Sequence, residues 1–443
     1  MTNKLIKFNF LFFFCFFLLT PSNQAEDANI QPIKKVESIS LMNCYDLALK
    51  RSETLAISKE EIERAEASFF QATSQALGHV NFVATDLRQD AATDGSSSGG
   101  SSVGGTLTQR ERKEAKFVVS QPLFQGFKSF GALTGAGNLR NQRRYEWIRA
   151  QHLLFLDVAR SFYQVLRYQK DLQTIEEIKK LFNERITDLS QREQIGRSRA
   201  SELATANAGL KSIEAELARS EGALKAEKNI LEFLTGISLE GLKLEDGIVP
   251  QEEKTISSFL MTLKKRSDVQ ASDNALKIAR KNLIVAQSGL WPFISLEHNR
   301  YTKREGFQSN IDWDLLFKID VPIFRGGETI GKIKDAVSNW KQSKFAFSRS
   351  TREAELDIKQ TYQDWYTSQE QYKALRDLVS AQEENFKLQK EDYAHNLVNN
   401  LDVLRALEEL YQANRQANEV YYQTKLNHWR LQVASGQCCQ EIS

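Results

Sequence analysis

Hydrophobic and polar residues alternate along one stretch of the chain, from Trp313 to Ile323. Apolar side chains occupy every second position of these eleven residues, and most positions between them are charged. A period of two is that of a β-strand whose two faces meet different surroundings. The length and the pattern predict a transmembrane β-strand with one face in lipid and one in water. The alternative interpretation is a strand of an antiparallel sheet that covers a soluble core.

Three shorter stretches also have the pattern of strands. We place the four predicted strands near residues 79–90, 115–124, 293–304 and 311–323. Four strands cannot close a membrane barrel, which needs about eight. An open sheet edge in lipid would leave backbone groups unpaired. A membrane sheet of this size therefore predicts a cyclic oligomer that closes the barrel between subunits.

A second period, of seven residues, predicts long coiled-coil helices. Leucines recur at this spacing at Leu203, Leu210, Leu217, Leu224 and Leu231. The seven-residue repeat is that of helices packed in a coiled coil. We expect arms of about 65 residues, or roughly 100 Å at ~1.5 Å per residue. The arms should reverse near Gly196 and Asn396, because glycine and asparagine tolerate the left-handed conformation of a tight turn.

The prolines reveal a duplication. Residues 123–249 and 323–443 contain no proline, and each stretch follows a similar phrase: QPLFQG at 121–126 and VPIFRG at 321–326. The matches continue at an offset of 200, as at Asp157 and Asp357. Proline is excluded from helix interiors. The sequence therefore predicts that each repeat passes from strand to helix at these phrases, marked by Pro122, Gly126, Pro322 and Gly326.

The duplication divides the chain into segments. We expect a first repeat at 26–236 with a helical hairpin at 128–236, a linker at 237–255, a second repeat at 256–436 with a hairpin at 328–436, and a tail at 437–443. The Ser/Gly-rich segment Asp94–Gly105 should be an extracellular loop between two strands.

The first 25 residues have the pattern of a secretory signal peptide. Two lysines precede an apolar run of ten residues, Phe10 to Leu19, and cleavage is expected near Ala25. An uncleaved anchor helix is the alternative, for which the run is short. Without residues 1–25 the chain has 57 basic and 57 acidic residues, so charge gives no reason to expect binding to nucleic acid.

The sequence predicts no enzyme, no cofactor and no metal site. Three cysteines remain after cleavage, Cys44, Cys438 and Cys439, and the five histidines are scattered. The histidines are interpreted as solvated or packed residues. A phosphate-loop spacing from Gly326 to Lys332 ends in Ile333, which has no hydroxyl to hold magnesium.

Together these features resemble the outer-membrane efflux protein (TolC-like) family. The resemblance rests on the duplicated Pro-Leu/Ile-Phe-x-Gly phrase, the phrase LDVLRA at 401–406, and the similar ends of the two hairpins at Gly236 and Gly436. It implies a mainly α-helical homotrimer with a twelve-stranded β-barrel in outer-membrane lipid and a helical tunnel in the periplasm. The helix tips would meet a periplasmic adaptor (membrane fusion) protein and an inner-membrane pump of the RND, ABC or MFS type.

The resemblance also implies a gate at the helix tips. Asp402 and Tyr393 match gate residues of the family, and Glu202 stands where the first hairpin carries an aspartate. Two positions depart from the pattern: Val398 replaces a gate arginine, and Arg405 replaces an acidic residue. The alternative interpretation of these charges is the solvated face of a coiled coil.

The adaptor would contact the tips at Gly196, Arg197, Asn396 and Leu397. The predicted function is therefore a passive outer-membrane exit duct for efflux or type I secretion. A periplasmic coiled-coil tether without a pore is the alternative. The sequence leaves open whether drugs, metals or a polypeptide pass through.

Overall fold

The computed structural model describes residues 38–89, 111–247, 255–306 and 308–437. The predicted signal peptide, the Ser/Gly-rich segment Asp94–Gly105, Cys438 and Cys439 lie outside these ranges. Residues from Ser38 onward form one unit. Its elements in chain order are β1 (Ser38–Ile39), α1 (Leu41–Arg51), α2 (Glu53–Leu77), β2 (His79–Arg88), β3 (Glu111–Gln125), α3 (Lys128–Gln194), α4 (Ala200–Thr235), β4 (Lys243–Leu244), α5 (Ile256–Met261), η2 (Leu263–Lys265), α6 (Ser267–Gln287), η3 (Ser288–Leu290), β5 (Phe293–Arg304), β6 (Trp313–Asp320), α7 (Glu328–Ala394) and α8 (Asn400–Ser435).

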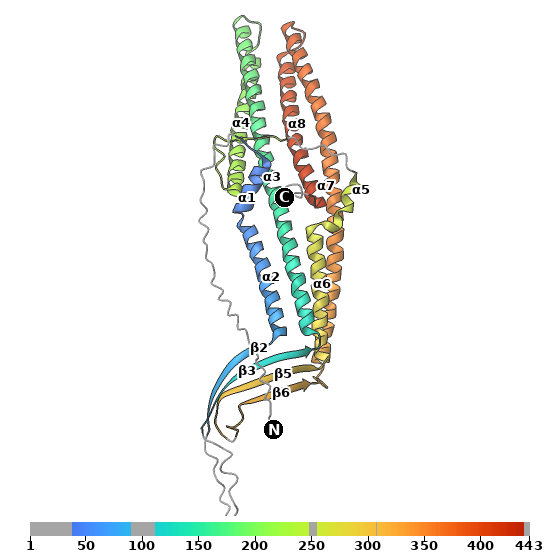
Figure 1. Cartoon of the computed structure of the whole chain (residues 1–443). Coiled ribbons are helices and arrows are strands. Elements are labelled where there is room, and N and C mark those ends of the chain that lie inside the picture. The colour runs from blue at the N-terminus through green and yellow to red at the C-terminus, as the bar shows by residue number, and fades with distance from the viewer. Residues whose placement is uncertain (1–37, 90–110, 248–254, 307, 438–443) are drawn as a thin grey trace, which may run out of the picture. The chain divides into compact units, whose positions relative to one another are not determined.

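Four strands form one antiparallel sheet in the order β2-β3-β5-β6 (Figure 1). The sheet contains the four predicted strands, but only β5 has both of its predicted bounds. β6 ends at Asp320 rather than Ile323, because Pro322 has no N–H group to donate to a ladder. β3 begins at Glu111 rather than near residue 115. The sequence did not predict this early start because the first residues of β3 are charged and have no apolar pattern. A second, two-stranded parallel sheet pairs β1 with β4 and was not predicted.

The two strand-to-helix passages share one backbone geometry. Gly126 and Gly326 both have a φ of +59°, and the residue after each also has a positive φ. At Gly126 an added Cβ would lie 2.6 Å from the carbonyl oxygen of Ser288, so the close approach requires glycine. Pro122 lies inside β3 rather than after it, next to a shift in the pairing register, and Pro322 follows β6. A β-bulge tolerates the missing N–H of proline.

Two helical hairpins extend from the sheet to tips at the opposite end of the unit (Figure 1). In each hairpin the first helix, α3 or α7, has 67 residues and the second, α4 or α8, has 36. The expectation of about 65 residues is thus wrong for the returning arms. The remaining length of α3 packs against α2 and α6, and that of α7 packs against α6. Within the described ranges, none of the helices is both long enough and apolar enough to span a bilayer.

Three hydrophobic clusters hold the helices together. The first surrounds Phe155 and Phe162 of α3, and the second lies near the tips around Ile178 and Leu407. The predicted leucine row faces these clusters: Leu203, Leu210 and Leu217 pack against the second, Leu224 packs against the first, and Leu231 belongs to the first. The third cluster lies around Phe259 of α5. Cys44 is a free thiol in the first cluster, and burial raises its pKa to about 12.

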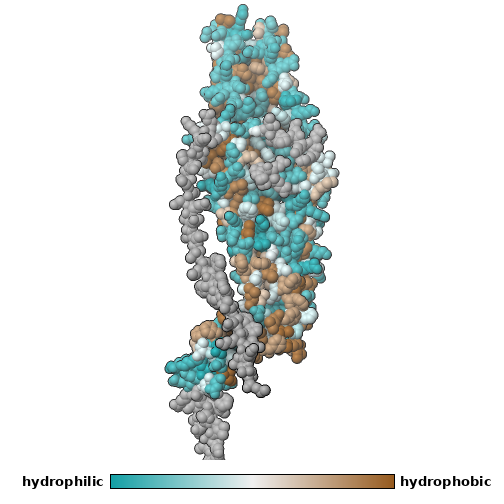
Figure 2. Space-filling model, in the orientation of Figure 1, coloured by the Kyte–Doolittle hydropathy of each residue, from teal (hydrophilic) through white to brown (hydrophobic). Residues whose placement is uncertain are grey.

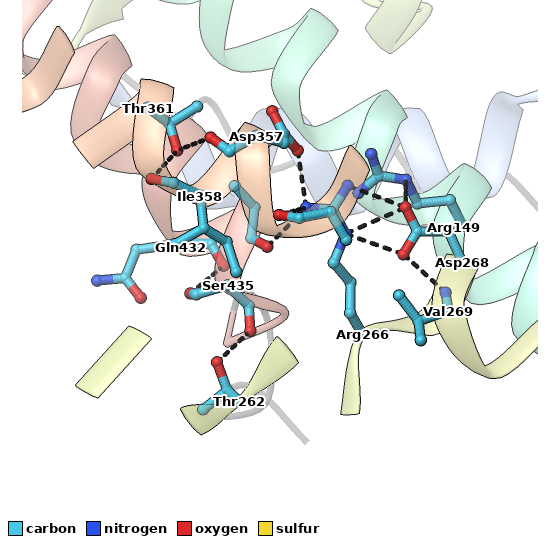
Figure 3. Close-up of polar contacts among 12 residues, drawn as sticks. Arg149, Thr262, Arg266, Asp268, Val269, Asp357, Ile358, Thr361, Gln432 and Ser435 are labelled. Carbon is cyan, nitrogen blue, oxygen red and sulfur yellow. Dashed lines mark hydrogen bonds and ion pairs between the residues drawn. The ribbon is translucent and has the colours of Figure 1, made fainter. Parts of the chain in front are cut away.

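A cluster of ion pairs joins four helices where α6 begins (Figure 3). The guanidinium of Arg266 donates to Asp268 at 2.9 Å and to the carbonyl of Ala434, in α8, at 3.0 Å. It also lies 2.7 Å from the carboxylate of Asp357 in α7. Arg149 of α3 lies 3.9 Å from Asp268. Burial alone would raise the pKa of Asp268, but hydrogen bonds from Arg266 and the two positive charges outweigh burial and hold this pKa below its usual value.

Candidate functional site

The two hairpins reverse through the same turn. Gly196 and Asn396 have φ values of +73° and +60°. The amide of the next residue bonds back five residues in each copy, from Arg197 to the carbonyl of Arg192 at 2.7 Å and from Leu397 to that of Asp392 at 2.9 Å. This is the Schellman geometry that ends a helix on a left-handed residue. The left-handed reversals therefore lie at the two positions that the sequence indicates.

Large apolar side chains are exposed at these turns. They are Ile195 in the first hairpin and Leu397 and Leu401 in the second, each about two-thirds exposed or more. Arg197 and Asn396 are exposed beside them. The tips therefore combine exposed apolar side chains with polar ones.

The structure places the three predicted gate residues near the tips but joins each to a different partner. Asp402 forms a capping box with Asn399: the Asn399 amide donates to the Asp402 carboxylate at 3.2 Å, and the Asp402 amide donates to the Asn399 side chain at 3.1 Å. Glu202 accepts a hydrogen bond from Ser198 at 2.8 Å. Within the described part of the chain, no hydrogen bond links Tyr393 to Asp402 or Glu202.

Tyr393 instead lies against two arginines of the other hairpin. The guanidinium carbon of Arg185 is 3.7 Å from the centre of the Tyr393 ring, and that of Arg192 is 4.7 Å away. Asp188 accepts from Arg185 at 2.9 Å and from Arg192 at 3.0 Å, and so holds the two cations side by side. Tyr393 is only 7% exposed.

Sequence reasoning missed these arginines, although their spacing carries a signal. Residues 185, 188 and 192 of α3 are separated by three and four positions, so they share one helix face. Val398, where the resemblance expects a cation, packs against the apolar cluster at the tips. Arg405, at the other departure, is exposed. A positive charge therefore does lie beside Tyr393, but arginines of α3 supply it rather than residue 398.

Arg185 makes a second contact between the hairpins. Its Nε donates to the side-chain oxygen of Asn400 at 2.8 Å, and the Asn400 amide nitrogen donates to the carbonyl of Glu202 at 3.5 Å. Asn400 is 1% exposed. Beside these residues lies a cavity of about 280 Å³, lined on its apolar side by Leu181, Phe386 and Leu407.

The sheet at the other end of the unit has two unlike faces. Residues paired across neighbouring strands point to the same face, and one face gathers apolar side chains that are exposed: Val80, Phe82, Phe117, Trp313, Leu315, Phe317 and Ile319. More exposed apolar residues lie where the helices meet the sheet, among them Phe130, Trp291 and Phe324. Figure 2 shows hydrophobic side chains gathered at this end of the helices.

The other face of the sheet carries a polar network. Asp314 accepts hydrogen bonds from Asn299 at 2.8 Å and from the hydroxyl of Tyr301 at 2.7 Å. Glu114 lies 3.4 Å from the ammonium of Lys116 and 3.9 Å from the guanidinium of Arg304. These charges are paired with one another rather than with a protein core, as on a surface that faces water.

Long helical hairpins above a small sheet with one apolar and one charged face define a membrane-anchored hairpin protein. A profile of the outer membrane efflux protein family matches residues 44–237 and 261–437. The chain belongs to the outer membrane efflux protein family, which places it in the outer membrane of a Gram-negative cell.

Several relatives and solved structures are similar to this chain. The cation efflux system protein CusC of Escherichia coli is 23% identical over 311 residues, which are 65% of each chain, so the match spans somewhat less than two thirds of CusC. The outer membrane protein TolC of Vibrio cholerae is 23% identical over 336 residues, 72% of this chain and 75% of TolC.

The fold is that of solved outer-membrane proteins. The structure of VceC from Vibrio cholerae superposes with a TM-score of 0.79 at 18% identity and covers 89% of this chain and 96% of VceC. The CmeC outer membrane channel of Campylobacter jejuni gives a TM-score of 0.77 at 18% identity, over 90% of this chain and 85% of CmeC.

Proposed function

We propose that the protein is the passive outer-membrane exit duct of a tripartite efflux or type I secretion system. It acts as a homotrimer. Three four-stranded sheets close a twelve-stranded barrel in outer-membrane lipid, and three pairs of hairpins enclose a tunnel in the periplasm. A periplasmic adaptor protein and an inner-membrane pump of the RND, ABC or MFS type complete the system and supply the energy.

The observation that carries this proposal is the two-faced sheet with two open edges. Among the described residues, β2 and β6 each pair on one side only, and unpaired backbone groups are not tolerated in lipid. Closure against neighbouring subunits removes both edges. The exposed apolar face around Phe317 then meets lipid, and the network around Asp314 lines a wet lumen.

The tips are the proposed contact surface for the adaptor. Gly196 and Asn396 set the turns, and Arg197 and Leu397 are exposed at them. Apolar side chains at a polar helix end favour association with another helical protein.

The same end is the proposed gate. One residue from each subunit makes a ring of three around a cyclic axis. Asp402, Glu202 and Tyr393 are the proposed ring residues, and the carboxylates of Asp402 and Glu202 are half-buried within one chain. Contact with the pump complex would shift the closed tips toward an open state.

Detergent extraction of outer membranes followed by planar-bilayer recording tests the proposal. We expect a trimer by light scattering and small single-channel steps that grow when the tips are opened. A coiled-coil tether without a pore would extract as a protein with no channel activity, and that result would refute the duct.

A further inference from the structure

We propose that Arg185 connects the first hairpin to the second at the closed tips, and that Tyr393 acts mainly through the face of its ring. This inference rests on the proposed function and names the contact that regulates its gate. It assigns the contact between the two hairpins to residues of α3 that the resemblance does not indicate.

The contacts of Arg185 run in two directions. Its guanidinium stacks on Tyr393, near the end of α7, and its Nε donates to Asn400, the first residue of α8. One side chain of the first hairpin therefore holds both helices of the second hairpin at the point where they reverse. Asn400 extends the link to the carbonyl of Glu202 in α4.

Burial makes this tie strong. The side chain of Arg185 is 10% exposed, and its Nη2 atom is inaccessible and has no hydrogen-bond partner among the described residues. A desolvated cation on an aromatic face gains more than an exposed one. Burial also lowers the pKa of Arg185, and the nearby Tyr393 and Asp188 oppose this shift. The guanidinium remains charged because its ordinary pKa lies far above neutral.

The tie can break without unfolding either hairpin. Each tip keeps its own Schellman turn at Gly196 or Asn396, and α8 keeps its capping box at Asp402. The cavity beside the Tyr393 ring gives the side chains room to separate. The two hairpins also share the second hydrophobic cluster, so the polar contacts of Arg185 add to this apolar contact close to the turns.

Asp188 is the positioning residue of this arrangement. It bonds both Arg185 and Arg192 and offsets the repulsion between two guanidiniums on one ring. Without it the two like charges would repel, so the stack would loosen even with Tyr393 intact.

Two readouts on the full-length trimer test the inference. The first is hydrogen exchange of the backbone amides at residues 400–407, which does not depend on channel activity. The variants are Arg185→Met, Tyr393→Leu and Tyr393→Phe, and the matched control is Lys180→Met on the exposed face of the same helix. The second readout is single-channel conductance of the same trimers in planar bilayers.

We expect Arg185→Met and Tyr393→Leu to speed exchange about five- to thirtyfold, the factor that a desolvated cation–π contact contributes to a local opening equilibrium. Tyr393→Phe keeps the ring and should behave as the wild type, as should Lys180→Met. The double variant Arg185→Met with Tyr393→Leu should exchange no faster than Arg185→Met alone, because Arg185→Met already removes the contact that Tyr393→Leu removes. Conductance should rise in the same variants.

Two results would overturn the inference: exchange in Tyr393→Phe as fast as in Tyr393→Leu, or wild-type exchange in Arg185→Met. A trimer that shows the expected exchange pattern but carries no current in any variant would instead refute the proposed duct. The two failures are therefore distinguishable.

Discussion

The guanidinium of Arg266 lies 2.7 Å from the carboxylate of Asp357, and this pair closes the joint between α6 and α7 (Figure 3). The first repeat carries Arg51 and Asp157 at the corresponding sequence positions. In the described part of the chain these two residues form no ion pair, and both are exposed. Arg51 lies against Gly236 at the end of α4 instead. The duplicated sequence thus forms an ion pair in the second repeat, which we call the closed joint, and leaves the corresponding residues of the first repeat unpaired with each other.

Breaking the closed joint should destabilise the protein. Arg266 is 4% exposed, and Arg266→Met leaves the carboxylates of Asp268 and Asp357 without their main partner. The side chains of Asp268 and Asp357 are 30% and 40% exposed, so hydration offsets part of the loss, which is about 2 kcal/mol rather than the larger cost of a fully buried pair. We expect Arg266→Met to lower the free energy of unfolding by about this amount in a urea titration. The matched control is Arg51→Met in the first repeat, and an equal loss there would contradict the difference between the two joints.

Stability should fall as pH drops below about 6.5 because of His152. His152 is buried, and burial together with the charge of Arg149 lowers its pKa, while Asp268 opposes this and Arg266 adds to it. The unfolded chain therefore takes up a proton at a higher pH than the folded chain. The contribution of neutral His152 to stability is fully present above the pKa that this histidine has in the unfolded chain. It is lost as the pH falls through the lower pKa that His152 has in the folded chain.

We expect His152→Gln to weaken this pH dependence of the unfolding midpoint between roughly pH 6.5 and 5, the range that a histidine governs. His395→Gln, at the exposed tip, serves as the control. If the unfolding midpoint of His152→Gln depended on pH as steeply as that of the wild type, His152 would not be the cause of the pH dependence.

A charge on the apolar face of β6 should block membrane insertion. Phe317 shares that face with Leu296, whereas its neighbour Leu316 is paired with Glu297 on the polar face. An arginine in lipid at the membrane midplane costs about 2–4 kcal/mol. We expect Phe317→Arg to reduce the trimer recovered from outer membranes and Leu316→Arg to leave it near the wild-type amount. Equal loss in both variants would argue against the assignment of the two faces.

Neutralising Asp402 should open the proposed gate and also weaken the start of α8. Asp402→Ala removes one half of the capping box with Asn399, which costs roughly 1 kcal/mol. It also removes three charges from the proposed ring. We expect a higher single-channel conductance and greater sensitivity of cells to large antibiotics. Asn399→Ala, which weakens the same cap but leaves the carboxylate, separates the two effects.

A tag in the Ser/Gly-rich segment should be reachable from outside the cell. This segment, around Ser98, connects β2 to β3, at the ends of these strands farthest from the helices. An epitope inserted after Ser98 should be labelled by antibody on intact cells. Labelling that requires lysis of the outer membrane would reverse the proposed orientation.

The sequence by itself determined the periodic features of this protein. The period of two around Phe317, the row of leucines from Leu203 to Leu231 and the phrases around Pro122 and Pro322 were enough to predict four strands, two long hairpins and their family. These features are local: alternation, heptad spacing and the loss of an N–H at proline act on neighbouring residues. The turn residues Gly196 and Asn396 could be predicted for the same reason.

Only the tertiary structure decided which residues meet across the hairpins. Arg185 and Tyr393 are more than 200 positions apart, and no local period relates a cation on α3 to a ring on α7. The lengths of the returning arms and the closed joint at Arg266 likewise depend on which helices pack together. Such contacts depend on the packing of elements that are distant in the chain. The same motif can therefore form an ion pair at Arg266 and leave Arg51 exposed, because the surrounding helices differ.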